Sequence, residues 1–433
     1  MRDPGEMIFY ADLHLHSHYS AATSSRMIIE DIIQGAFMKG LQIIGTGDAL
    51  HKGWLEELKR GLEEIPGAGL YKPKIGKIGI FFLAQTEVGT VFEVKGKVRH
   101  VHHVILMRSL EVAEQLRERL SKYGDLDADG RPILSIRPAE LVEIVLETDK
   151  ESLIYPAHAW TPWRSIFGSI NGVRSMEECY EDATDRIHAL ETGMSSDPPM
   201  NWRISALDKY TLVSASDAHS PWPFRIGREA CVFELQKLSY REIREAIMNK
   251  DPRRLLMTIE VDPAYGKYHF SGHRNCGIGP LSHEEASRLG YRCPVCHKRL
   301  TMGVESRIEE LADRAPGYRP IGAIGYMSLL PLHEILALGE PEKSLYSEAL
   351  QIEYERIVRQ IGSEFKVLIE ASREELARVV PQKIVDAILK LREGKIRVIP
   401  GYDGVYGKPV FDFEVSHERD RKASERFLED FLR

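Results

Sequence analysis

The sequence predicts an α/β protein: a barrel of strands and helices, then a short Cys/His-rich ribbon, then a mainly helical C-terminal domain. Residues 7–260 alternate short apolar runs with amphipathic stretches, as repeated strand–helix units do. Paired cysteines and histidines follow, and after them mostly helical patterns. At 433 residues the chain is long enough for two or three domains. We expect these domains to span residues 1–262, 263–303 and 304–433.

Composition places the chain among soluble globular proteins. It is 43% hydrophobic and 28% charged, and no apolar run approaches the roughly 20 residues that span a membrane. Residues 1–5 lead straight into the first strand, so we expect no signal peptide and a cytoplasmic location without membrane contact. Five cysteines, three of them within residues 276–296, argue against a disulfide framework. The net charge of −7 argues against non-specific coating by nucleic acid but allows a local basic groove.

The barrel elements follow from the periodicity of apolar residues. We expect strands at residues 41–46, 78–83, 103–107, 153–156 and 211–214, and helices at residues 28–39, 111–122, 138–147 and 240–249. Alternation of strands and helices predicts a parallel sheet, and this number of units indicates a closed barrel. In such barrels the chemistry takes place at the C-terminal ends of the strands.

Polar side chains gather beside those strand ends. His14 and His16 are two residues apart, so on a strand they share one face and form a ready pair of metal ligands. Others accompany the later strands: Asp48 and His51, Glu87, His102 and His103, His158, and finally Asp217 and His219. Since the barrel brings its strand ends together, this joint pattern predicts a metal cluster.

These residues resemble the polymerase and histidinol phosphatase (PHP) domain in order and spacing. The matching positions are His14-x-His16, Thr46-x-Asp48, Glu87, His103, His158 and Asp217-x-His219. The resemblance implies a distorted barrel that holds two or three Zn²⁺ or Mn²⁺ ions and hydrolyses phosphoesters. The family has a histidine directly after the aspartate of the second motif, whereas this chain has Ala49. Either Asp48 or His51 would take that place. Residues 21–24 offer no counterpart to the family's third ligand in the first motif.

The expected chemistry is hydrolysis assisted by Zn²⁺, Mn²⁺ or Mg²⁺. Divalent ions lower the pKa of a water molecule and clamp the attacking and leaving oxygens at phosphorus. We expect Glu87 to bridge two ions, and Glu87, His158 and Asp217 to form the catalytic set. Asp217 would be a ligand and could also orient the water.

A loop between the last two motifs carries candidate phosphate contacts. Asn201 and Arg203 could hold a phosphate, with Ser195 and Ser196 donating to its oxygens. The alternative is a structural loop with a solvated arginine. Nearby tryptophans could stack on bases or pack under loops: Trp160, Trp163 and Trp222.

A structural zinc site is predicted in the ribbon. His273-x-x-Cys276 and Cys293-x-x-Cys296 are two ligand pairs separated by sixteen residues. His269 and His297 are adjacent alternatives to His273. Basic residues surround the pairs and would either meet phosphates or form a solvated face: Lys267, Arg274, Arg288, Arg292, Lys298 and Arg299.

The C-terminal region reads as helices at residues 304–313, 328–338, 343–361, 381–392 and 418–432, interrupted by strands at 365–369 and 396–399. A Gly-rich turn at residues 400–407 carries Tyr402 and Tyr406. These tyrosines could stack on an extruded base, or the segment could be a plain hairpin turn.

Along nearly its full length the chain resembles the endonuclease Q family. The resemblance rests on the PHP motifs, Gly272-His-Arg-Asn-Cys, Cys293-Pro-Val-Cys, Ile308-Glu-Glu-Leu-Ala-Asp-Arg-Ala and Pro400-Gly-Tyr-Asp-Gly-Val-Tyr-Gly. It implies a DNA repair enzyme that nicks double-stranded DNA 5′ to deaminated bases (hypoxanthine, uracil, xanthine) and abasic sites. Arg274, Tyr402 and Tyr406 would then contact DNA. The rival interpretations are a small-molecule phosphatase and a non-catalytic DNA-binding protein.

Overall fold

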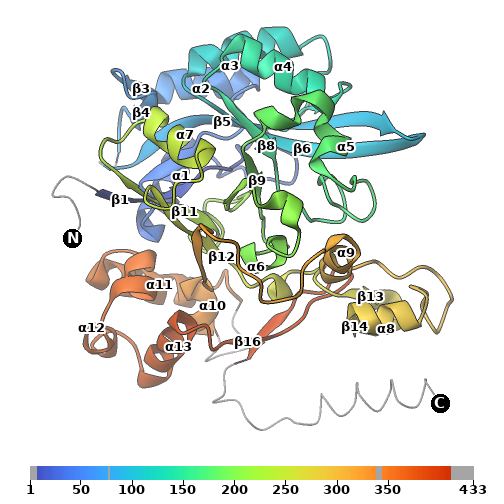
Figure 1. The fold of residues 1–433 in the computed structure, drawn as a ribbon. Helices are drawn as coiled ribbons and strands as arrows, with labels where there is room; N and C mark the ends of the chain where they lie inside the picture. Colours follow the sequence, from blue (N-terminus) through green and yellow to red (C-terminus); the bar gives the residue numbers. More distant parts are fainter. Residues whose placement is uncertain (1–6, 77–78, 338–343, 411–433) are drawn as a thin grey trace.

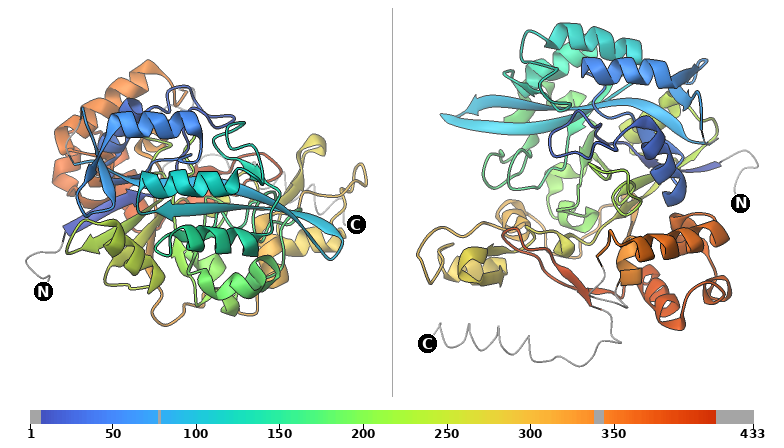
Figure 2. Two further views of the ribbon diagram at one scale, coloured as in Figure 1. Left: turned by 90° about the horizontal axis from the view of Figure 1, so that it is seen from above. Right: turned by 180° about the vertical axis from the view of Figure 1, so that it is seen from behind.

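The computed structural model describes residues 7–76, 79–337 and 344–410 and has the mixed α/β architecture that the sequence predicts. Residues 7–260 form a barrel with helices packed around it (Figure 1). A small Cys/His module and a group of helices lie apart from each other at the same end of this barrel, as Figure 1 and the right view of Figure 2 show. Within the described ranges, no helix has the length and apolarity that crossing a membrane requires.

The central sheet contains eleven strands among the described residues. They are β1 (Met7–Asp12), β2 (Ile43–Gly45), β3 (Leu62–Ile65), β4 (Leu70–Pro73), β5 (Phe81–Val94), β6 (Lys97–Met107), β7 (Ile133–Leu134), β8 (Leu153–Pro156), β11 (Ala230–Leu235), β12 (Leu255–Glu260) and β15 (Gly325–Ser328). A separate parallel pair, β9 (Ala189–Glu191) and β10 (Thr211–Val213), lies between β8 and β11 without joining either ladder. The barrel is therefore distorted, with a seam on each side of this pair.

The sheet is mixed, whereas the alternation of strands and helices predicts a parallel one. Strands β1–β2 and β2–β5 pair in parallel, but β1–β11, β5–β6 and β6–β8 are antiparallel. The difference arises at β5 and β6, which Lys95 and Gly96 join directly as a hairpin. Both residues have positive φ, 52° and 73°, the conformation that tight two-residue hairpin turns require.

Helices cover the outside of the barrel through one apolar face each. The helices of this region are α1 (Ile29–Lys39), α2 (Lys52–Gly61), α3 (Leu110–Leu120), α4 (Pro138–Thr148), α5 (Met176–Tyr180), α6 (Pro198–Asn201) and α7 (Tyr240–Met248). In α1 the buried residues Ile32, Ile33 and Ala36 recur at helical spacing. Gly40 ends this helix with a φ of 98°, which suits glycine.

Two side chains fix the strand ends that carry the polar residues. The Gln85 side-chain oxygen accepts hydrogen bonds from the backbone N–H groups of Leu15 and Gly47, so it ties three chain segments together. The buried indole of Trp54 donates to the carbonyl oxygens of Thr46 and Gly47. These contacts hold the loops after β1 and β2 at one end of the barrel.

The Cys/His module has a small core of its own. It consists of β13 (Ser271–His273), β14 (Ile278–Leu281) and α8 (His283–Arg288). Ser282 and Glu285 form a capping box at the start of α8. Ile278, Leu281 and Ala286 are buried together.

The C-terminal region is mainly helical, as expected. It contains α9 (Val304–Leu311), α10 (Leu332–Ala337), α11 (Glu348–Ile361), α12 (Arg373–Ala377) and α13 (Gln382–Arg392), followed by the hairpin of β16 (Arg397–Ile399) and β17 (Lys408–Val410). The strand expected at 365–369 is wrong, since Lys366–Glu370 is a single π-helical turn. A short apolar run of this kind fits a buried helical turn as well as a strand. The helix expected at 418–432 lies outside the described residues.

Buried ion pairs join these helices to the barrel. Lys39 of α1 donates to Glu364 at 2.7 Å, and both side chains are buried. Arg228 pairs with Glu334 of α10 at 3.1 Å, again with both side chains buried. These two buried ion pairs attach the helical region to the barrel.

Candidate metal centre and its cavity

Glu87 on β5 lies at the centre of the polar cluster. Its Oε1 is 2.7 Å from His102 Nδ1 and 3.0 Å from His158 Nε2. Its Oε2 is 3.3 Å from His16 Nε2 and 3.7 Å from His14 Nε2. One carboxylate therefore faces two groups of histidines with its two oxygens, which is how a bridging ligand of a two-metal site is placed.

Two sets of potential ligand atoms result, each with its atoms within 4.8 Å of one another. One consists of His14, His16, Glu87 and Asp217, and the other of Glu87, His102 and His158. The two sets share Glu87. Among the described residues, the barrel thus holds a compact group of nitrogen and oxygen donors at one end.

Neighbouring side chains orient these histidine rings. The Nδ1 of His14 lies 2.9 Å from the Glu191 carboxylate, and the Nδ1 of His16 lies 2.9 Å from Asp48. A carboxylate can only accept here, so each ring donates through Nδ1 and turns Nε2 toward the cluster. Carboxylates that hold the second nitrogen in this way are typical of metal-binding histidines.

The donor set fits divalent metal ions. His14 Nε2, Glu87 Oε2 and His102 Nδ1 are buried and make no hydrogen bond with the described residues. Such atoms carry an uncompensated desolvation cost, which a bound cation would remove. Burial by itself would raise the pKa of Glu87, but His102 and the other histidines hold it well below its usual value, so the carboxylate is charged.

Three polar residues at this end of the barrel have an uncommon backbone conformation. His158, Asp48 and Asp217 have φ values of 28°, 40° and 49°. Non-glycine residues rarely adopt positive φ, and the cost persists where the surroundings enforce the conformation. Asp48 and Asp217 follow strand ends β2 and β10, and His158 follows β8, so the strain aims three polar residues at one point.

Asp48 and His51, the alternatives for the second motif, both lie outside the two ligand sets. Both oxygens of Asp48 are occupied by His16, by Ser17 and by Ser20. His51 accepts from the backbone N–H of Trp54 at the start of α2. In the structure Asp48 orients a histidine and His51 caps a helix.

His103 is also placed elsewhere, which corrects the sequence expectation. Its Nδ1 lies 2.8 Å from the Tyr180 hydroxyl and its Nε2 lies 2.9 Å from the Thr90 hydroxyl. Side chains alternate along a strand, so His102 faces Glu87 and His103 faces away. The His219 ring lies next to that of His16, with ring centres 4.5 Å apart and the planes tilted by 47°, and its Nδ1 is 2.8 Å from the Asp217 carbonyl, so it borders the cluster.

Sequence reasoning missed two charged residues of this centre. Glu191 ends β9 in the same way that the other polar residues follow apolar strands, so the pattern at Leu190-Glu191 could have revealed it. Arg131 lies in a loop without such a pattern. Its guanidinium is 3.6 Å from Glu87.

The cluster opens into a cavity of about 610 Å³. His102, His158, Asp217 and Arg131 line it at the metal centre. The remaining wall comes from other parts of the chain and is rich in aromatic and basic groups: Trp163, Arg164, Arg228, Tyr265, Lys267, Tyr268 and Tyr406. Residues of the barrel, of the segment 261–268 and of the turn between β16 and β17 therefore line one cavity.

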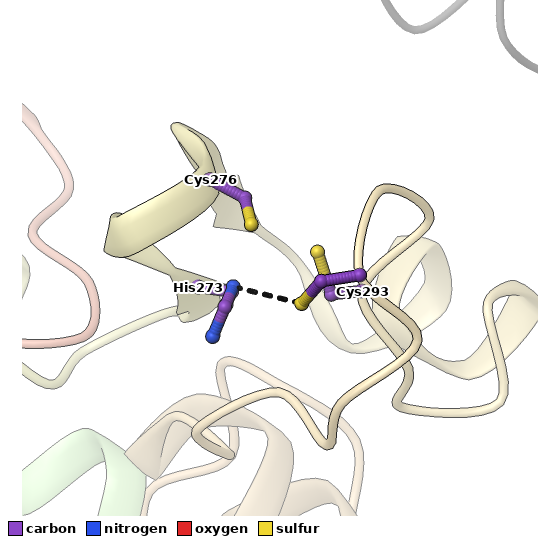
Figure 3. A group of neighbouring side chains, drawn as sticks. His273, Cys276 and Cys293 are labelled. Carbon is purple, nitrogen blue, oxygen red and sulfur yellow. Dashed lines mark hydrogen bonds between the residues drawn. The ribbon is translucent and has the colours of Figure 1, made fainter.

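The four residues of the predicted zinc site meet in the Cys/His module. The ligand atoms of His273, Cys276, Cys293 and Cys296 lie within 4.8 Å of one another. Figure 3 shows the sulfur of Cys276 and that of Cys293 pointing into the space beside the His273 ring, and His273 Nδ1 is 3.7 Å from Cys296 Sγ. Although desolvation opposes ionisation, backbone N–H groups of Cys296 and Val295 lower the pKa of Cys293 to about 7. A zinc ion would bind that thiolate.

Comparison with known proteins identifies the family. A crystal structure of the lesion-specific endonuclease PfuEndoQ from Pyrococcus furiosus is 34% identical, with a TM-score of 0.83, and the match covers 96% of this chain and 99% of that one. This chain belongs to the endonuclease Q family. An endonuclease Q bound to a 27-mer duplex with an abasic lesion at the active site is 35% identical, also with a TM-score of 0.83, and the match covers 96% of this chain and all of that one.

Two further matches concern MJ0043 of Methanocaldococcus jannaschii. Residues 331–395 match the family model of the MJ0043 C-terminal domain. The uncharacterized protein MJ0043 itself is 32% identical over 280 residues, which is 63% of this chain but only 34% of that protein. The chain therefore spans about a third of the length of this relative.

In this endonuclease Q chain, the loop at 190–203 is not free to hold a phosphate. Arg203 forms a two-pronged ion pair with Glu309 and also donates to the Arg314 carbonyl. Asn201 is buried and bonds to Trp160 and to Ser196. Asn201 therefore makes contacts inside the barrel, whereas Arg203 is not the solvated arginine of the structural alternative and instead joins the barrel to α9. Ser195 does line the cavity.

The remaining candidate DNA contacts of this chain differ in exposure. Tyr402 packs over Gly272 and Gly279, where an added Cβ would come within 2.4 Å of its ring. It therefore joins the hairpin to the Cys/His module rather than offering a free face. Tyr406 is 54% exposed and borders the cavity, as does Trp163 at 41%. Arg274 is exposed on the module.

Proposed function

We propose that this protein is a metal-dependent DNA repair endonuclease that hydrolyses the phosphodiester 5′ to deaminated bases and abasic sites. The observation that carries the proposal is the Glu87-centred pair of ligand sets at the base of a cavity with an aromatic and basic rim. Membership of the endonuclease Q family supports it. The abasic duplex bound by a relative supports the substrate class.

The residues that would hold the catalytic ions are His14, His16, Glu87 and Asp217 on one side and Glu87, His102 and His158 on the other. Bound Zn²⁺, Mn²⁺ or Mg²⁺ supplies Lewis-acid charge and lowers the pKa of water at the phosphodiester. Asp217 is partly exposed to the cavity at 28%, so its carboxylate would orient the attacking water. Glu191 and Asp48 hold the His14 and His16 rings in place.

The cavity rim fits a nucleotide that has left the helix. Trp163 and Tyr268 lie edge to face with ring centres 5.1 Å apart, and Lys267 lies over Tyr268 and Tyr406. Exposed aromatic faces stack on bases, and extrusion costs least for mismatched or missing bases. Selectivity for damaged DNA would arise partly from that lower cost.

The Cys/His module would bind a structural Zn²⁺ and contact the duplex backbone. The four donors His273, Cys276, Cys293 and Cys296 match a tetrahedral zinc shell. Arg274 on the same module is exposed and would meet phosphates. The proposed domains span residues 1–262, 263–303 and 304–433.

The deciding experiment is a nicking assay on labelled duplexes that carry one deoxyuridine, deoxyinosine or abasic site, with Mn²⁺ or Mg²⁺ supplied. We expect a single cut 5′ to the lesion, which EDTA abolishes and which Asp217→Asn slows by at least about 10²-fold, because the variant loses a charged ligand. Glu114→Gln, an exposed residue on α3, is the matched control and should cut normally.

The other outcomes separate the rivals. Equal cutting of undamaged duplex would indicate a general nuclease. Release of phosphate from small monoesters without any duplex cleavage would indicate a small-molecule phosphatase. Duplex binding that survives EDTA, with no cutting under any metal, would indicate a non-catalytic DNA-binding protein.

A further inference from the structure

We propose that Arg131 binds the phosphate that is cut, placing its guanidinium against a non-bridging oxygen and stabilising the charge of the transition state. This inference rests on the proposed function and adds to it a catalytic residue that lies outside the metal-ligand sets.

The loop that carries Arg131 is firmly attached to the metal centre. Gly130 donates to the Tyr19 carbonyl at 3.1 Å, and an added Cβ at this glycine would lie 2.4 Å from the Asp48 carboxylate. The Arg131 backbone N–H donates to Asp129 at 2.9 Å. Further back, Asp127 pairs with Arg117 at 2.6 Å. The side chain therefore starts from a fixed point directly over the cluster.

The guanidinium itself remains available. Its side chain is 15% exposed and lines the cavity beside Asp217. Its closest carboxylate contact is Glu87 at 3.6 Å, beyond hydrogen-bonding distance, and it forms no side-chain hydrogen bond within the ranges that the structure describes. Arginine is always protonated, so this position holds a permanent positive charge with unused donors.

The other cations that line the cavity are placed differently. Arg228 is buried and committed to Glu334 at 3.1 Å. Arg164 and Lys267 are exposed at the rim. Among the described cavity residues, Arg131 is the cation that contacts the metal-ligand cluster itself.

The chemistry of the guanidinium suits this role. Its planar fork of N–H groups matches the oxygens of a phosphate. Because Glu87 lies beyond hydrogen-bonding distance, a phosphodiester in the cavity would attract the guanidinium. Arg131 neither gives nor takes a proton. It supplies fixed donors where charge develops, and removing one such donor typically costs about 10²–10³ in rate.

The test compares Arg131→Gln and Arg131→Lys with Arg119→Gln, an arginine on α3 that pairs with Glu147 away from the cavity. Three quantities are measured: the single-turnover nicking rate with Mn²⁺, the metal content, and the salt dependence of duplex affinity in EDTA. We expect Arg131→Gln to nick about 10²–10³-fold more slowly with unchanged metal content. Its slope of log Kd against log salt should fall by about one.

Arg131→Lys should recover part of the rate, and Arg119→Gln should match the wild type in all three measurements. An Arg131→Gln protein that nicks at the wild-type rate would overturn the inference. So would a loss of metal in that variant, since Arg131 would then act by holding Glu87. If the wild type does not nick at all, the proposed function fails. The salt slope still decides the phosphate contact in that case, and an unchanged slope refutes it.

Discussion

At the scale of single residues, some side chains of the site face the position of the metals, and others orient those side chains by hydrogen bonds. The pair His14 and His16, together with Glu87, His158 and Asp217, could be predicted because polar residues that end apolar strands converge in a barrel. The sequence motif favoured His103, whereas His102 is the histidine that faces Glu87; the two adjacent histidines differ only in which face of β6 they occupy, so sequence alone could not make this choice. Asp48 matches its motif, yet its oxygens accept hydrogen bonds from His16 and two serines.

This division predicts different effects for Asp48 and His51. Asp48→Asn should weaken metal affinity about 10–100-fold, because a weaker partner orients the His16 ring. His51→Asn keeps a good N-cap for α2 and should leave affinity unchanged. Titration of metal-free protein with Mn²⁺ measures both. A larger loss for His51→Asn would make that residue the ligand.

At the scale of elements, sequence patterns located six helices to within two residues, namely α1, α3, α4, α7, α9 and α13, whereas α2, α5, α6, α8 and α12 were not predicted. The helix expected at 138–147 is α4 (Pro138–Thr148), because proline at the first position and regular apolar spacing mark it. Patterns failed where tertiary contacts decide the conformation, as in the π-helical turn at Lys366–Glu370. Strands β11 and β12 were missed entirely, and β12 ends in a buried glutamate, Glu260.

The buried carboxyl of Glu260 on β12 makes the free energy of unfolding depend on pH. Burial raises its pKa to about 7, although hydroxyls of Ser214, Thr258 and Thr192 donate to it. The nearby carboxyl of Asp197 adds to the rise, while burial and the charge of Glu260 raise the pKa of the buried Glu229. A raised carboxyl pKa means that the folded state binds the proton more tightly. The contribution of Glu260 to stability is therefore fully present below pH 4.5 and is lost as the pH rises through 7.

We expect Glu260→Gln to remove this pH dependence. The variant should be more stable than the wild type at pH 8 by up to about 3 kcal/mol, which is the shift from 4.5 to about 7 expressed as free energy. Near pH 5 the gain should largely vanish. Urea unfolding at the two pH values measures the difference. An equal gain at both would show that Glu260 stays charged in the folded protein.

At the scale of the whole molecule, the helical region is attached by contacts between residues far apart in sequence. Lys39 and Glu364 lie 325 positions apart, and Glu364 also accepts from the Leu332 backbone and the Tyr354 hydroxyl. No local pattern could pair them. The sequence nonetheless predicts three regions, because the two ligand pairs of the Cys/His module lie between a segment with strand-like patterns and a segment with helix-like patterns.

Breaking this buried pair should destabilise the protein strongly. Lys39→Met leaves the Glu364 charge uncompensated, and we expect a loss of about 3–5 kcal/mol. The double variant Lys39→Met/Glu364→Gln should recover much of that loss. Lys59→Met, which removes an exposed pair with Glu114, should cost less than about 1 kcal/mol. Denaturant midpoints compare all three, and similar midpoints for both single variants would contradict the argument.

Because of the two gaps beside the β9–β10 pair, bound metal ions would also affect how the barrel wall is held together. His158 follows β8 on one side of the first seam, Asp217 follows β10 beside the second, and His14 and Glu87 belong to the continuous ladder. Ions shared by these residues would span both gaps. Single backbone hydrogen bonds cross these gaps, from Ala159 to the Glu191 carbonyl and from His16 to the Ala218 carbonyl. Coordination bonds would add to them, so loading the metals would also strengthen the closure of the barrel.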